Sequence, residues 1–215
     1  MELRPALIDA AAAHRRRGRR VALLVRHAER GAITDLARHH EVLLTELGHR
    51  CAATSGERLA QAIDPADTVD VALFHSPVER CKETALGLHK GLTSKGKKAV
   101  VVGERHAFGA SYLKDEGGVA RAFLRHGRGF VRAWFDGDIA HDVIDPCDLV
   151  VTRQLDALRH ALEAHAFVVA VSHDWNIAAL KEHTLGLRFE DHGWPQFLDG
   201  VVAWVDGTKL VVDPA

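Results

Sequence analysis

Three stretches of the chain run from apolar residues directly into arginine, histidine or aspartate. They are "VALLVRHAER" (21–30), "VALFHSPVERCKETA" (71–85) and "VVAVSHDWNIAAL" (168–180). Charged side chains crowded at the end of a buried strand lose hydration and repel one another unless opposite charge or water compensates them. A bound anion would provide that compensation. The residues that would meet it are Arg26, His27, Arg30, Arg80, His173 and Asp174.

The arginines suit one anion in particular, a phosphate group. A guanidinium presents a planar pair of donors to two phosphate oxygens and stays charged at any ordinary pH. We expect helices to start after His27, Ser76 and Asp174, and their N-termini would add backbone N–H donors. Ser76 followed by Pro77 is typical of a helix start, with the serine as N-cap. The sequence therefore predicts a phosphate clamp assembled from distant parts of the chain.

The same charges favour His27 as a nucleophile. Three guanidiniums nearby should lower the pKa of its imidazole below the ordinary value of about 6.5, which leaves a lone pair free to attack phosphorus. With a phosphate dianion bound, His173 can be protonated and donate to the phosphoryl oxygens. Asp174 is placed to protonate the leaving oxygen and then to take a proton from water.

These residues need a scaffold that brings strand ends together. Apolar runs that alternate with helical patterns predict a three-layer α/β/α sandwich with a mostly parallel central sheet, whose site lies at the carboxyl ends of the strands. "DGT" between the last two runs indicates a hairpin. The expected strands are 21–25, 69–74, 98–103, 167–172, 200–205 and 209–213, and the expected helices are about 45–63, 77–91, 148–165 and 174–186.

Residues 104–147 break this alternation, because they mix glycines with aromatic and charged residues. This composition is typical of an irregular insertion. We predict a single domain over 1–215 in which 104–147 forms a lid or substrate-specificity insertion. Arginines at helical spacing within it would line one helix face, either as a solvated surface or to meet a substrate with more than one anionic group. They are Arg121, Arg125, Arg128 and Arg132.

Length and composition exclude several classes of protein. The 215 residues, 47% hydrophobic and 27% charged, suffice for one domain with a substantial core. A formal net charge of -1 lacks the positive excess expected of a nucleic-acid-binding protein. The first apolar run, 21–25, is too short for a secretory signal or a membrane span. Because Cys51, Cys81 and Cys147 are widely spaced and odd in number, they suit a reducing compartment, and we expect a cytoplasmic protein.

Four motifs in order resemble the histidine phosphatase superfamily, which also contains the cofactor-dependent phosphoglycerate mutases. Arg26-His27 matches the opening Arg-His motif, although Ala28 stands where the family usually has glycine, and the longer Arg-His-x-x-Arg form is typical of the acid phosphatase branch. The other three are "LTELGHRCAATSGERLA", "SPVERCKETA" and "SHDWNIAALKEHTLGL". The likeness spans roughly residues 21–187. It implies a phosphoglycerate mutase-like fold and a phosphatase that works through a covalent phosphohistidine on His27.

The resemblance also implies a second candidate acid. "GERHAFGASY" is similar to the mutase-like branch, in which a glutamate in this context donates the proton, so Glu104 competes with Asp174. We favour Asp174 because it directly follows His173. The substrate-binding candidates are Arg26, Arg30, Arg80 and Arg105.

The expected reaction is hydrolysis of a small-molecule phosphate ester without a metal or an organic cofactor. The chain has no His-Glu-x-x-His pattern, and "RHHEV" (38–42) lacks a recognisable set of further ligands. Two alternatives stay open. A phosphomutase of the phosphoglycerate mutase type would return the phosphoryl group to the product instead of to water, and a non-catalytic phospho-ligand-binding or regulatory protein would lack the nucleophile or the acid.

Overall fold

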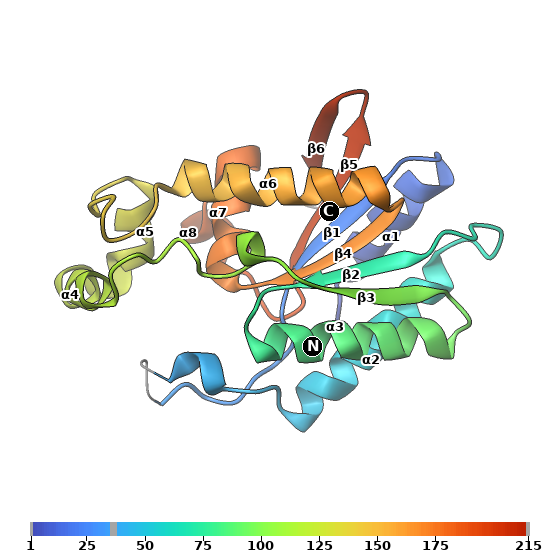
Figure 1. Cartoon of the computed structure of the whole chain (residues 1–215), viewed down its shortest axis with the longest axis horizontal. Coiled ribbons are helices and arrows are strands. Elements are labelled where there is room, and N and C mark those ends of the chain that lie inside the picture. The colour runs from blue at the N-terminus through green and yellow to red at the C-terminus, as the bar shows by residue number, and fades with distance from the viewer. Residues whose placement is uncertain (1, 35–37, 214–215) are drawn as a thin grey trace.

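The computed structural model describes residues 2–34 and 38–213 and is built around one six-stranded sheet (Figure 1). The strand order is β3-β2-β4-β1-β5-β6. The first four of these strands are parallel to one another, whereas β5 is antiparallel to β1 and forms the predicted hairpin with β6. The strands are β1 (Val21–Arg26), β2 (Val71–His75), β3 (Ala99–Glu104), β4 (Phe167–Ser172), β5 (Gly200–Asp206) and β6 (Lys209–Asp213).

Three strands are buried on both faces, as their continuous apolar runs predicted. Every residue of β1, β2 and β4 is buried. Within β1, Val21 and Leu23 pack into the core on one face of the sheet, and Ala22 and Leu24 pack into the core on the other. The centre of the sheet therefore needs helices on both sides.

Helices cover both faces and confirm the predicted α/β/α architecture (Figure 1). Helices α1, α2 and α3 supply the core on one face, and α6 and α7 supply it on the other. Within the described part of the chain, no helix has both the length and the apolar character needed to cross a bilayer. The helix bounds are α1 (Pro5–Arg16), α2 (Glu46–Ala62), α3 (Glu79–Ser94), α6 (Cys147–Ala164) and α7 (Asp174–Leu185).

Helices α2 and α3 approach each other through glycines. A Cβ atom on Gly91 would lie 2.0 Å from the carbonyl oxygen of Ala53, and one on Gly56 would lie 2.2 Å from that of Leu88. Backbones can come this close only where no side chain intervenes. This contact fixes α3, which carries Arg80, against the rest of the molecule.

Residues 104–147 form a lobe with a hydrophobic cluster of its own. The lobe contains α4 (Glu116–His126) and α5 (Phe130–Phe135), which extend beyond one end of the sheet (Figure 1). Its cluster includes Phe130 and Trp134 and also takes side chains from α6 and α7. The lobe is thus anchored to the helices that flank β4.

The arginines of this lobe do not line one helix face, so that expectation is wrong. Helix α4 ends at His126, and Gly127, with a φ of 52°, opens a 3-10 turn (Gly127–Gly129, η3) before α5 begins. Because a left-handed φ suits glycine and ends a helix, the spacing of the arginines is not carried through. Arg132 instead forms an ion pair of 2.6 Å with Glu182 of α7.

Candidate active site

The carboxyl ends of β1, β4 and β2 lie side by side and bring the predicted clamp residues together. β4 pairs in parallel with both β1 and β2. His27 and His173 directly follow β1 and β4, and Arg80 lies in the first turn of α3. These three side chains belong to residues that are only 2%, 8% and 5% exposed. Buried basic groups gathered at a strand end indicate an anion site.

His27 holds its imidazole in one tautomer. Its Nδ1 lies 2.8 Å from the carbonyl oxygen of Ala28, which can only accept, so Nδ1 carries the proton. Its Nε2 therefore has a lone pair, which accepts a hydrogen bond of 3.1 Å from the Nε of Arg80. The backbone N of Ala28 in turn donates to Thr84 Oγ1 at 3.0 Å, which holds the turn after β1 in place. The unprotonated Nε2 is the form that a nucleophile requires.

Burial is the main reason why His27 is neutral. Loss of water, reinforced by the charge of His173 and then of Arg80 and Arg26, lowers the pKa of His27 to about 2. The direction agrees with the sequence-based prediction. The cause differs, because desolvation of the ring outweighs repulsion by the guanidiniums.

His173 lies beside His27 and bonds to a serine. Its Nε2 lies 2.8 Å from Ser76 Oγ and 3.6 Å from Cys81 Sγ. The two imidazole rings are 5.6 Å apart between centroids. Burial, followed by the charge of Arg80, lowers the pKa of His173 to about 3. The site therefore contains two adjacent imidazoles that are neutral in the absence of an anion.

Two predicted helix starts differ in the structure. α3 begins at Glu79, so Ser76 lies ahead of the helix and its hydroxyl is available to the site. The expected helix directly after His27 is absent, because the described residues between β1 and α2 contain only a 3-10 turn (His39–Glu41, η1). α7 begins at Asp174 as predicted. Backbone donors at the site thus come from fewer helix ends than expected.

Arg26 connects the clamp to Asp174. Its Nη2 lies 2.9 Å from Asp174 Oδ2, its Nη1 donates to the carbonyl of Pro195 at 2.7 Å, and its guanidinium carbon lies 4.2 Å from the ring centre of Phe197. Burial lowers the pKa of Arg26, against the opposing effect of Asp174. Its Nε is buried and has no hydrogen-bond partner among the residues that the structure describes. An oxygen of a bound anion would satisfy that donor.

Arg80 and Arg30 complete the cationic cluster. Arg80 Nη1 donates to the carbonyl oxygen of His39 at 2.8 Å, and burial lowers its pKa. Arg30 is half-buried, and its charge lowers the pKa of Arg26, Arg80 and His173. The charges of the three arginines therefore act on one another.

Glu104 and Arg105 lie apart from this cluster. Glu104 ends the edge strand β3, which β2 and β4 separate from β1. Its side chain is 58% exposed and lies 4.0 Å from His106. Arg105 is exposed, donates to the backbone carbonyl of Glu104 and stacks over the ring of Phe74 at 4.8 Å. Of the two candidate acids, the structure brings Asp174 to the clamp.

One segment of the site, residues 193–199, was not indicated by any motif. The carbonyl oxygen of Asp199 accepts a hydrogen bond from the backbone N of Arg26 at 2.8 Å. The Asp199 carboxylate is held by Lys181 at 2.8 Å and by Arg4 at 3.4 Å. The only sequence signal for this segment is its place immediately before β5, the antiparallel neighbour of β1.

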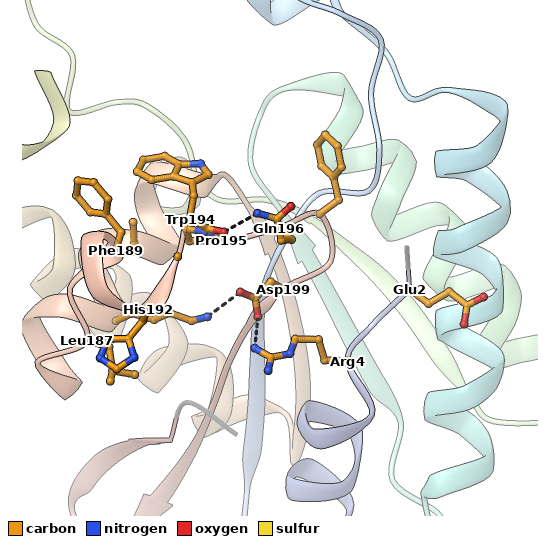
Figure 2. Close-up of a pocket in the computed structure, with 13 residues that line it drawn as sticks. Glu2, Arg4, Leu187, Phe189, His192, Trp194, Pro195, Gln196 and Asp199 are labelled. Carbon is orange, nitrogen blue, oxygen red and sulfur yellow. Dashed lines mark hydrogen bonds and ion pairs between the residues drawn. The ribbon is translucent and has the colours of Figure 1, made fainter. Parts of the chain in front are cut away.

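A cavity of about 560 Å³ adjoins this segment, and Figure 2 shows Arg4 and Asp199 joined across it. Both basic residues beside Asp199, Arg4 and Lys181, pair with its single carboxylate, which offsets one of their two positive charges. His27 does not line this cavity. In residues 2–34 and 38–213, no three side chains of the metal-ligating types gather into a metal site.

The sequence matches the model of one protein family, the histidine phosphatase superfamily (branch 1), over residues 22–206. This chain belongs to the histidine phosphatase superfamily. The matched region contains the whole clamp and the lobe 104–147. Some motifs of the sequence are most similar to the acid phosphatase branch, and this assignment to a branch stays a prediction.

Solved structures share the fold of this superfamily member at low sequence identity. Mycobacterial hydrolase 1 is 18% identical with a TM-score of 0.58, over 91% of this chain and 97% of that chain. The phosphate complex of the mycobacterial glucosyl-3-phosphoglycerate phosphatase Rv2419c is 19% identical (TM-score 0.53; 90% and 95% covered). Phosphoglycerate mutase from Bacillus anthracis is 16% identical (TM-score 0.54; 90% and 91% covered). No curated protein sequence matches the chain. The fold is thus the one shared by phosphoglycerate mutases, as predicted.

Proposed function

We propose that this superfamily member hydrolyses a small-molecule phosphate monoester through a covalent phosphohistidine on His27. The observation that carries the proposal is the orientation of His27. Its Nδ1–H is tied to a carbonyl oxygen, and its Nε2 lone pair faces Arg80 inside a group of buried cations. A neutral imidazole is a competent nucleophile toward phosphorus.

The reaction has two steps. In the first, His27 Nε2 attacks phosphorus in line, an N–P bond forms, the P–O bond to the alcohol breaks, and Asp174 gives its proton to the leaving oxygen. In the second, Asp174 takes a proton from water as the water oxygen attacks phosphorus, the N–P bond breaks, and inorganic phosphate leaves. Nδ1 of His27 keeps its proton throughout, because the Ala28 carbonyl holds it.

The arginines stabilise the transferring group. In the loose transition state of phosphoryl transfer, negative charge lies on the equatorial oxygens, so positioning and electrostatics account for most of the rate. A bound phosphoryl group would satisfy the unpartnered Nε of Arg26 and would draw Arg80 away from the His27 lone pair. Arg30 and a protonated His173 would add further donors. No metal or organic cofactor takes part in this scheme.

Asp174 is the proposed acid because of its neighbours. Its Oδ2 touches Arg26, so a phosphoryl group that takes over the Arg26 Nη2 donor would free this carboxyl group to hold a proton next to the ester oxygen. Glu104, whose side chain points into solvent at the sheet edge, is not assigned a role in the chemistry, and Arg105 is likewise not assigned to the phosphate.

We further propose that the lobe 104–147 serves as the substrate-specificity insertion. Trp175, the residue after Asp174, packs against Phe123 and Phe130 of the lobe, with ring centres 5.8 Å and 5.3 Å apart. Through these contacts the lobe packs against the residue that follows Asp174 in the chain. The three cysteines are buried and are not joined by disulfide bonds, which favours a cytoplasmic location.

Trapping of the phosphoenzyme tests the proposal. Wild-type protein mixed with a radiolabelled aryl phosphate and quenched in alkali should retain acid-labile label and should release inorganic phosphate at steady state. His27→Ala should retain none and should lose turnover by about a thousandfold or more. His14→Asn is the control, because His14 is also buried but lies on α1. Normal turnover by His27→Ala would exclude the mechanism, and transfer of label to a second substrate without release of phosphate would identify a mutase.

A further inference from the structure

Two aromatic side chains from the segment 193–199 flank the reacting groups. Phe197 lies against His27, with ring centres 5.7 Å apart, and covers the Arg26 guanidinium at 4.2 Å. Trp194 donates its indole N–H to Asp174 Oδ2 at 3.2 Å. Both residues are half-buried, so each keeps part of its ring surface accessible.

The position of Asp174 defines where the leaving group lies. The alcohol oxygen must be within hydrogen-bond reach of the acid, on the side of phosphorus away from the nucleophile. Since Trp194 touches the same carboxylate oxygen, the alcohol must pass beside the indole ring.

Both rings are held rigidly. Trp194 packs edge-on against Phe189 of the short helix α8 (Phe189–His192), with ring centres 5.1 Å apart at 84°. Phe197 is backed by the guanidinium of Arg26, which is itself fixed by Pro195. Figure 2 shows Trp194, Pro195 and Gln196 in succession along one wall of the adjoining cavity. Rigid aromatic surfaces bind flat apolar groups at little entropic cost.

Two arginines outside the clamp, Arg132 and Arg105, are engaged away from the reacting groups. Arg132 is bonded to Glu182 and Glu190 on the helices behind the lobe. Arg105 lies over Phe74 at the sheet edge. The arginines that converge on the site, by contrast, are those of the phosphate clamp itself.

We propose that the leaving group of the substrate is an alcohol that carries a flat aromatic ring, which packs against Trp194 beside the acid. This inference rests on the proposed function. The segment 193–199 is then a second specificity element beside the lobe 104–147, and Trp194 is its main ring contact because it touches the acid. Phosphate esters with a carboxylate in place of the ring are poor substrates.

Three alkyl phosphates with leaving alcohols of similar basicity test this assignment: 2-phenylethyl phosphate, n-butyl phosphate and 3-carboxypropyl phosphate. We expect kcat/KM for the phenylethyl ester to exceed that for the butyl ester by about tenfold, mainly through KM, and the carboxypropyl ester to be the poorest. Trp194→Ala should bring the phenylethyl-to-butyl ratio toward one, whereas Phe197→Ala, a change beside the nucleophile, should keep it. Phe197→Tyr should keep the ratio, and so should Gln196→Ala, which removes an exposed side chain from the same segment.

The ratio is the readout because Phe197→Ala also removes packing from Arg26 and can slow every ester. A ratio near one in the wild type, or a ratio unchanged in Trp194→Ala, overturns this inference while the phosphatase assignment stands. No turnover of any ester together with no phosphoenzyme overturns the proposed function, and this inference with it.

Discussion

The Nε of Arg80 donates a hydrogen bond of 3.1 Å to the Nε2 of His27, so a guanidinium occupies the lone pair that the proposed reaction needs. Both groups are buried, and burial lowers the pKa of each. Substrate must therefore exchange this bond for one between Arg80 and a phosphoryl oxygen before attack. In the free protein the same bond keeps two buried polar groups satisfied.

Removal of the Arg80 guanidinium should affect catalysis more than folding. We expect Arg80→Ala to lower kcat/KM for an aryl phosphate by about a hundredfold to a thousandfold, because a preorganised donor to the transferring group is lost. Arg80→Lys should recover only part of this, since an ammonium cannot form the bidentate contact. Steady-state kinetics check both values. Lys82→Ala, an exposed change on the same helix, is the control, and equal losses in Lys82→Ala and Arg80→Ala would contradict the assignment.

The two candidate acids can be separated by the leaving group. We expect Asp174→Asn to slow hydrolysis of an alkyl phosphate by about a hundredfold or more, because an alkoxide leaves poorly without a proton. The loss should be much smaller for p-nitrophenyl phosphate, whose phenolate needs no proton. Glu104→Gln should change neither rate by more than about twofold, since Glu104 is exposed at the sheet edge. A large loss with the alkyl ester in Glu104→Gln, and none in Asp174→Asn, would instead identify Glu104 as the acid.

The buried histidines should make the protein sensitive to acid. Burial lowers the pKa of His27 to about 2 and of His173 to about 3, whereas both should titrate near 6.5 in the unfolded chain. Below about pH 6.5 the unfolded state therefore binds more protons than the native state, and stability falls as pH falls. Each histidine should contribute about 1.4 kcal/mol of lost stability per pH unit between these limits.

Urea unfolding between pH 4.5 and 7.5 measures this slope. The double variant His27→Asn, His173→Asn should show a shallower dependence than the wild type, whatever its absolute stability. Identical slopes in the two proteins would show that the imidazoles are protonated in the native state.

The contact between α2 and α3 predicts a stability defect without a catalytic one. A Cβ on Gly91 would lie 2.0 Å from a backbone carbonyl oxygen, so Gly91→Ala should force the helices apart and cost about 2–3 kcal/mol. Gly129→Ala is the matched control, because a Cβ there meets nothing within 4 Å. Urea unfolding gives the free energies, and kcat of the folded fraction should stay close to that of the wild type. A loss of stability below about 0.5 kcal/mol in Gly91→Ala would contradict the close helix contact.

Much of the fold follows from local patterns. The runs that became β1, β2 and β4 are apolar along their whole length, and the structure buries each of them on both faces. The "DGT" turn between β5 and β6 can be predicted from its own residues alone. The end of α4 was missed because Gly127 interrupts an otherwise helical spacing, and that spacing alone does not reveal the break.

The candidate residues of the clamp could also be proposed from the sequence, because arginine and histidine after a buried strand need an opposite charge nearby. The side chains that hydrogen-bond to them could not be predicted in this way. Ser76 fits a helix cap by type, yet α3 starts later and leaves its hydroxyl to His173. Segment 193–199 has no motif, and it reaches Arg26 only because β5 returns antiparallel to β1.

Residue types and apolar runs are local properties, and they suffice to predict which side chains carry charge to the ends of the strands. Which of those ends meet depends on how the strands are ordered in the folded sheet. Strand order places β4 beside β1 and brings Asp174 to Arg26, whereas β2 separates β4 from β3, the edge strand that carries Glu104. Strand order depends on the packing of helices on both faces of the sheet, and that packing involves residues distant in the chain.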